Sequence, residues 1–175
     1  MKHSSKMQKD SRKIVLQTET TGFSPKEGHK LVEIAAIEID KNDNPTGAVF
    51  HAYINPERDI PQEVVAVHGL DYDFLKDYPS FNAYKDNFLR FIKSKELIGH
   101  HLEYDMNFIN HELGFTLPNK VTDTLDMAKR AFPEQKNSLS SLCERLNVKT
   151  KNSPFSGALL DALRMLEIYK KLKNI

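Results

Sequence analysis

A run of apolar residues that stops abruptly at polar, turn-forming residues is the feature that most constrains this fold. The run Ile14–Leu16 favours a buried β-strand, and Thr20–Gly22 opens a turn. Gln17 and Glu19 are two residues apart, so both point to one face of an extended strand. A carboxylate at the end of a buried strand needs a positive partner, and a divalent cation is one candidate. Alternatively, Glu19 only caps the loop.

Length and composition are those of one globular domain. The chain has 175 residues, of which 39% are hydrophobic and 28% are charged, and this excludes disordered and fibrous classes. The net charge of +1 means that a nucleic-acid partner must be held by a local basic patch or by metal ions. Cys143 is the only cysteine, which excludes an internal disulfide and fits a reducing compartment.

The N-terminal residues are polar and basic and lack the apolar segment of a secretory signal. We interpret residues 1–12 as a disordered basic arm and residues 13–175 as a single domain. No apolar run approaches the length of a membrane span, so we expect a cytoplasmic protein without membrane contact.

The remaining sequence alternates strand and helix patterns. Residues 31–40 and 48–55 are typical of strands, and the tight turn between them predicts an antiparallel pair. Leu97 and Ile98 predict a short buried strand. Amphipathic spacing, prolines and capping residues predict helices at 61–68, 71–78, 80–92, 104–112, 121–132, 137–146 and 153–172.

Several carboxylates lie where they need a partner. Asp105 falls in the first turn of a predicted helix, where it either caps the helix or binds a metal ion. Asp161 lies among leucines, and a metal shared with other carboxylates would supply its partner. We interpret Asp123 as a helix cap and Glu33 as a structural acceptor within the sheet, with a supporting role at the site as the alternative.

Three segments, at 17–22, 100–105 and 156–161, each carry an acidic residue, and together they resemble the motifs of the DEDDh-type 3′–5′ exonuclease family. That family is typified by the epsilon (proofreading) subunit of bacterial DNA polymerase III. The similarity extends to residues 27–30, 67–69, 121–123 and 137–139. The resemblance implies an α/β, ribonuclease H-like fold: a mixed central sheet of about five strands, flanked by helices, with the first three strands antiparallel and the later ones parallel to the first.

The resemblance also implies a site for two divalent ions, usually Mg²⁺ or Mn²⁺, held by four acidic residues, and a histidine that acts as general base. Carried over residue by residue, Glu19, Asp105 and Asp161 match three metal ligands. Positions matching those that hold a single-stranded DNA or RNA 3′ end are Thr20, His68, His101 and Tyr104.

Two catalytic positions depart from the family pattern. Gln17 stands where the resemblance expects the aspartate that bridges both ions, and Ser156 stands where it expects the histidine base. Because glutamine is neutral, ion binding is expected to weaken, to one ion or none. Losing a positioned base typically costs about 10²- to 10⁴-fold in rate. His100 and His101 are alternative bases.

Three hypotheses follow. The chain is a catalytically degenerate exonuclease domain that still binds a nucleic-acid 3′ end, a polymerase or another replication or repair protein. Alternatively, it is an active metal-dependent exonuclease that releases mononucleotides with an unorthodox base such as His101, or a scaffold with a vestigial groove. The sequence ends at Ile175 without the family's C-terminal extension, so a polymerase tether of that kind is not expected.

Overall fold

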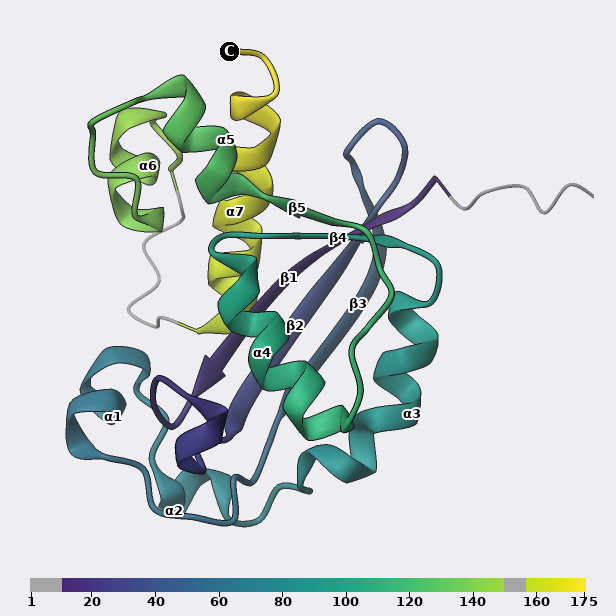
Figure 1. The fold of residues 1–175 in the computed structure, drawn as a ribbon, viewed down its shortest axis with the longest axis vertical. Helices are drawn as coiled ribbons and strands as arrows, with labels where there is room; N and C mark the ends of the chain where they lie inside the picture. Colours follow the sequence, from purple (N-terminus) through teal and green to yellow (C-terminus); the bar gives the residue numbers. More distant parts are fainter. Residues whose placement is uncertain (1–10, 150–156) are drawn as a thin grey trace, which may run out of the picture.

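A five-stranded mixed sheet forms the centre of the structure, a computed structural model that describes residues 11–149 and 157–175 (Figure 1). The first ten residues of the predicted arm and Ser156 lie outside the described residues. The strand order in the sheet is β3-β2-β1-β4-β5. The strands are β1 (Lys13–Thr20), β2 (Leu31–Ile39), β3 (Pro45–Tyr53), β4 (Glu96–Gly99) and β5 (Val121–Asp123).

Strand directions follow the prediction. β1, β2 and β3 are successively antiparallel, whereas β4 pairs parallel to β1 and β5 parallel to β4. The position of β5 was predicted wrongly, because residues 121–123 form a strand and not the first turn of a helix. Three residues are too few to show a period-2 pattern, and the helix that follows starts only at Thr124.

The two faces of the sheet are covered by different helices, because alternate residues of each strand point to opposite sides. Ile14 and Leu16 pack with α3 (Phe81–Ile92) and α4 (Leu102–Leu113). Val15 packs with α7 (Ala158–Leu172). β2 is buried along its whole length, as expected for a strand covered on both faces.

Smaller helices complete the two ends of the molecule (Figure 1). α5 (Thr124–Ala131) and α6 (Leu139–Arg145) pack with α7 at one end of the molecule. α1 (Gln62–His68) and α2 (Tyr72–Leu75) lie at the opposite end, near the C-terminal end of β1. Among the described residues, no helix combines the length and the apolar character needed to cross a membrane.

Candidate active site

Alternation along β1 sends the candidate residues to two sides of the sheet. Val15 faces α7, so Gln17 and Glu19 continue on that side, as predicted. Leu16 faces α4, so Thr18 continues on the other side. The end of β1 can therefore meet groups from both helices.

Asp105 reaches β1 from α4 and is only 2% exposed. Its Oδ1 accepts hydrogen bonds from the backbone N–H of Thr18 at 3.0 Å and from the Thr18 hydroxyl at 2.5 Å. Burial raises the pKa of Asp105 to about 7, although the two bonds from Thr18 act in the opposite direction. The carboxylate therefore anchors α4 on β1.

Glu19 is partly buried next to other carboxylates. Burial raises its pKa to about 8, and the nearby charges of Asp161, Glu33 and Asp105 add to this effect. Carboxylates from β2, α4 and α7 thus lie close enough to the Glu19 carboxylate, on β1, to raise its pKa. A cation there would relieve the repulsion that otherwise favours the protonated form of Glu19.

Gln17 carries an unused acceptor. Its Oε1 is the one buried side-chain nitrogen or oxygen atom, among those of the described residues, that has no hydrogen-bond partner. A buried acceptor left unsatisfied costs about 1–3 kcal/mol. Amide oxygens are ordinary ligands of hard divalent cations, so this atom is a candidate donor to an ion.

Asp161 and Glu33 complete the acidic group. Asp161 lies in the first turn of α7, and its Oδ1 accepts a hydrogen bond of 2.8 Å from Nη1 of Arg164. Glu33 opposes Glu19 across the β1–β2 pair. One oxygen of Glu33 accepts the backbone N–H of Ala158 at 2.9 Å, and the other lies 2.7 Å from Nε2 of His51. The interpretation of Glu33 as a structural acceptor agrees with these contacts.

Three of the predicted nucleic-acid-binding residues meet at the turn after β1. The hydroxyl groups of Thr20 and Tyr104 are 2.7 Å apart, and both donate to the carbonyl oxygen of Gly22, at 2.8 and 2.7 Å. Nε2 of His68 donates to the carbonyl oxygen of Thr20 at 3.1 Å, while its Nδ1 accepts the N–H of Leu70 at 3.0 Å. His68 is buried, and burial lowers its pKa. The neutral imidazole therefore shapes the turn.

A glycine packs closely against a histidine in this turn. A Cβ atom at Gly22 would lie 2.3 Å from the imidazole of His29, so any other residue there would force this ring to move. Nδ1 of His29 is 3.0 Å from the hydroxyl of Thr21, which is fully buried. This packing holds the polar tip of β1 in one shape.

Of the two alternative bases, His100 is engaged through its imidazole and His101 through its backbone. Nδ1 of His100 lies 2.9 Å from the hydroxyl of Thr124, and burial lowers the pKa of His100. His101 has a left-handed backbone (φ 58°) at the start of α4, where its N–H donates to Oδ1 of Asp123 at 2.9 Å. Asp123 also accepts the N–H of Leu125 at 2.8 Å, as its interpretation as a cap predicts.

One exposed aromatic residue was missed by the sequence analysis. Phe23 is 84% exposed directly after Gly22, and with Tyr104 and Phe115 it lines a hollow of about 790 Å³ beside the turn. An aromatic residue next to a turn glycine in a predicted site was the signal that could have identified it.

The donor set limits which metal centre these residues can form. No group of three or more histidine, cysteine, aspartate or glutamate side chains in residues 11–149 and 157–175 is arranged to hold a metal ion. On the α7 side, Glu19 and Asp161 offer carboxylates and Gln17 offers an amide oxygen, while the oxygens of Glu33 are engaged by Ala158 and His51. Without Glu33 this set carries two negative charges, which suits one hard divalent cation better than two.

Solved structures share this fold. Exonuclease X, in complex with 5′ overhanging duplex DNA, matches with a TM-score of 0.74 and 20% sequence identity, over 93% of this chain and 90% of that chain. The nuclease domain of 3′hExo, a DEDDh family member bound to rAMP, matches with a TM-score of 0.77 and 14% identity, over 95% of this chain and 94% of that one. The ribonuclease H-like exonuclease fold predicted from the sequence is confirmed.

Sequence comparisons reach the same family. The exonuclease family profile matches residues 14–169. DNA polymerase III subunit epsilon of Rickettsia conorii is 45% identical over 170 residues, covering 92% of this chain and 73% of that protein. The subunit epsilon of Salmonella typhimurium is 40% identical over 171 residues, covering 91% and 70%. The chain therefore belongs to the exonuclease family and is similar over most of its length to DNA polymerase III subunit epsilon.

Proposed function

We propose that this chain is an epsilon-like 3′–5′ exonuclease domain whose catalysis is impaired and which still binds nucleic-acid 3′ ends. The observation that carries the proposal is the buried, unpaired Oε1 of Gln17 at the position where the family resemblance expects a charged, ion-bridging aspartate. A neutral amide offers one oxygen and no charge there.

Gln17, Glu19 and Asp161 would hold one Mg²⁺ or Mn²⁺ ion. When bound, such an ion lowers the pKa of a water molecule and stabilises negative charge on a phosphate. Asp105 contributes to the field at Glu19, but its Oδ1 is occupied by Thr18. A second ion would lack the bridging carboxylate, so we expect weak metal binding with one ion at most.

Proton transfer from the attacking water is the second impaired step. A serine at position 156 cannot accept a proton near neutral pH unaided, and loss of a base costs about 10²- to 10⁴-fold in rate. The imidazoles of His100 and His101 have no hydrogen bond or ion pair with Glu19 or Asp161 among the described residues. The geometry therefore gives little support to a replacement base.

Binding of a 3′ end is supported by the intact turn after β1. Thr20, His68 and Tyr104 hold this turn in one shape, and the exposed ring of Phe23 lies beside it. Stacking of a base on an aromatic ring contributes about 1–3 kcal/mol and tolerates any sequence. We propose that Phe23 and Tyr104, with His101, form the binding surface for a single-stranded 3′ end.

A degradation assay tests the proposal. A 3′-labelled single strand is incubated with Mn²⁺ and either the natural chain or the Gln17→Asp, Ser156→His double variant. The double variant is expected to release mononucleotides at least about 10²-fold faster, because it regains the bridging charge and the base. Asp161→Ala in the double variant is the matched control and should abolish the gain.

Other outcomes separate the remaining hypotheses. Comparable cleavage by the natural chain, lost in its own Asp161→Ala variant, would show that the chain is a working exonuclease. Cleavage by neither protein, together with no binding of the strand, would favour a scaffold with a vestigial groove.

A further inference from the structure

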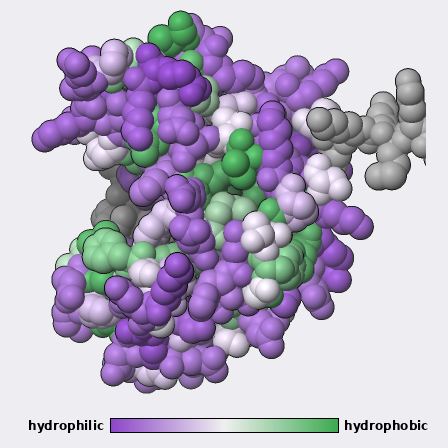
Figure 2. All heavy atoms as spheres, viewed as in Figure 1, coloured by the Kyte–Doolittle hydropathy of each residue, from purple (hydrophilic) through white to green (hydrophobic). Residues whose placement is uncertain are grey.

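An apolar hollow of about 540 Å³ lies between the C-terminal end of α3 and the connection from α4 to β5. Leu89, Phe115, Leu117 and Pro118 contribute to its walls, and Phe115 is 46% exposed. Figure 2 shows hydrophobic side chains gathered over this part of the molecule, bordered by hydrophilic ones. Exposed apolar hollows with a polar border mark binding surfaces on soluble proteins.

The walls of this hollow are preorganised. Nδ2 of Asn119 donates to the carbonyl oxygens of Ile92 and Lys95, both at 2.8 Å, and these bonds satisfy the end of α3. The Lys85 ammonium lies 5.8 Å from the centroid of the Phe115 ring, which orients the ring. A ligand would therefore meet a surface whose backbone groups are already paired.

Unpaired positive charge borders the hollow. Arg90 and Lys93 line it, and neither forms an ion pair with another described residue. Beside it is a second hollow of about 520 Å³, which shares Ser94, Pro118 and Asn119 with the first. The charged residues that line the second hollow are Arg12, Lys13, Lys41, Lys95, Glu96 and Lys120.

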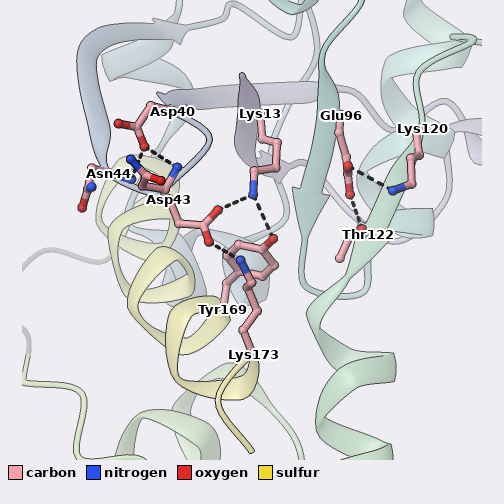
Figure 3. Close-up of polar contacts among 10 residues, drawn as sticks. Lys13, Asp40, Asp43, Asn44, Glu96, Lys120, Thr122, Tyr169 and Lys173 are labelled. Atoms are coloured by element: carbon pink, nitrogen blue, oxygen red, sulfur yellow. Dashed lines mark hydrogen bonds and ion pairs between the residues drawn. The ribbon is translucent and has the colours of Figure 1, made fainter. Parts of the chain in front are cut away.

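Some of the charged residues that line the second hollow form ion pairs within the protein. Lys120 pairs with Glu96 (Figure 3), with 3.1 Å between Nζ and Oε2, and Nζ of Lys95 lies 2.7 Å from Oε2 of Glu38. Lys41 is exposed and has no ion pair with another described residue. The surplus charge of the surface is therefore positive: Arg90 and Lys93 line the apolar hollow, and Lys41 lines the second hollow beside it.

We propose that this surface docks a segment of a partner protein in which apolar side chains are followed by acidic residues. The apolar hollow would take the apolar side chains, and the bordering cations would pair with the carboxylates. A nucleic acid fits less well, because the hollow itself is apolar and a phosphate backbone needs a continuous cationic track.

The surface lies away from the carboxylates of the candidate active site, although Phe115 also lines the hollow beside Phe23 and Tyr104. β1 and β4 are parallel and begin beside this surface, at Lys13 and Glu96, whereas Thr20 and Gly99 end them at the site. A docked partner would therefore leave the end of β1 open. The proposal does not depend on whether the chain hydrolyses nucleic acid.

Amide NMR of the full chain tests this proposal with three defined probes. The first is a synthetic peptide of leucine and phenylalanine followed by a run of aspartates. The second peptide carries lysines in place of the aspartates, and the third probe is oligo-dT. We expect saturable shifts at Ser94, Leu117 and Lys120 with the acidic peptide alone.

Charge reversal provides the matched comparison. The Arg90→Glu, Lys93→Glu variant should weaken binding of the acidic peptide by about ten-fold, because both rim charges then repel it. The Lys129→Glu, Arg130→Glu variant reverses the same two residue types on the exposed face of α5 and should leave binding unchanged. Absence of saturable shifts, equal shifts with the lysine peptide, or stronger shifts of the same amides with oligo-dT would each overturn the proposal.

Discussion

Glu33 shows how one buried carboxylate can both add to an acidic group and position another member of it. It is 2% exposed and opposes Glu19, yet its own oxygens contact the N–H of Ala158 and Nε2 of His51. A carboxylate that accepts an N–H at the start of a helix is favourable both as a cap and in the field of the helix dipole. Because Asp161 follows in the first turn of α7, Glu33 sets where that carboxylate lies.

The first prediction removes this contact. Glu33→Ala should lower the free energy of unfolding by about 1–3 kcal/mol, because a buried N–H and an imidazole lose their partner. Urea unfolding measures the change. Glu63→Ala, on the exposed side of α1, is the control and should change the free energy by at most about 0.5 kcal/mol. Equal effects of both substitutions would contradict the positioning role.

At the scale of whole elements, the turn between β2 and β3 ties three segments together. Asp43 lies between the ammonium groups of Lys13, at the start of β1, and Lys173, at the end of α7 (Figure 3). Nζ of Lys13 is also 3.3 Å from the Tyr169 hydroxyl. Burial acts to raise the pKa of Asp43, but the hydrogen bonds and charges of both lysines outweigh it and lower the pKa below its ordinary value.

The second prediction follows from that lowered pKa. Asp43→Asn keeps the left-handed backbone (φ 64°) that asparagine tolerates, but removes the charge. At neutral pH it should cost roughly 1.5–3 kcal/mol, the usual range for hydrogen bonds to charged groups. A carboxyl group with a lowered folded-state pKa stabilises above its unfolded-state pKa and loses this contribution as the pH falls through the folded-state value.

Denaturant unfolding at neutral and acidic pH checks this prediction. The difference between Asp43→Asn and the natural chain should shrink below about pH 4, near the unfolded pKa of aspartate. Asp73→Asn, in an exposed pair with Lys76, is the control: the hydrogen bond and charge of Lys76 also lower the pKa of Asp73, but solvent screens this pair, so the difference and its pH dependence should be much smaller. A difference that stays constant down to strongly acidic pH would argue against the ion pairs.

At the scale of the whole molecule, the sheet brings together carboxylates that arrive from both of its faces. Asp105 comes with α4 on one face, Asp161 comes with α7 on the other, and Glu19 receives the field of both. The fold therefore concentrates negative charge in a buried place. Such an arrangement costs stability when the groups ionise, unless a cation is bound.

The third prediction concerns pH and metal. The pKa of Glu19 rises from 4.5 to about 8, so the unfolded chain gives up this proton more readily than the folded one. Without a divalent ion, stability should fall as the pH rises from about 4.5 to about 8. Asp105, whose pKa rises from 3.8 to about 7, contributes in the same direction. Mn²⁺ should restore the stability at the alkaline end, since it binds only the folded state.

Thermal unfolding in chelator and in Mn²⁺ measures both effects. Glu19→Gln is expected to flatten the pH dependence and to reduce the stabilisation by Mn²⁺. A melting temperature that is independent of pH and Mn²⁺ would contradict a charged, ion-accepting site.

The arrangement of the candidate site was only partly accessible from the sequence. The motifs indicated Glu19, Asp105 and Asp161, and Asp123 was recognised as a cap because its place near the start of a predicted helix is local information. The sequence could not show that Asp123 also accepts the N–H of Leu102 at 2.8 Å and so caps α4. It also could not show that Phe23 stays exposed, because exposure depends on what packs nearby.

The sequence by itself determined the three N-terminal strands, the amphipathic helices and the family with its motif residues. These features depend on local pattern and residue type. Only the tertiary structure decided the place of the three-residue β5, the unpaired oxygen of Gln17 and the contacts of Glu33. The reason is that strand pairing, side-chain burial and the electrostatic field at a residue all depend on groups that are distant in the chain. Residues 19, 33, 105 and 161 acquire their shared chemistry only once the sheet and its two helical layers assemble.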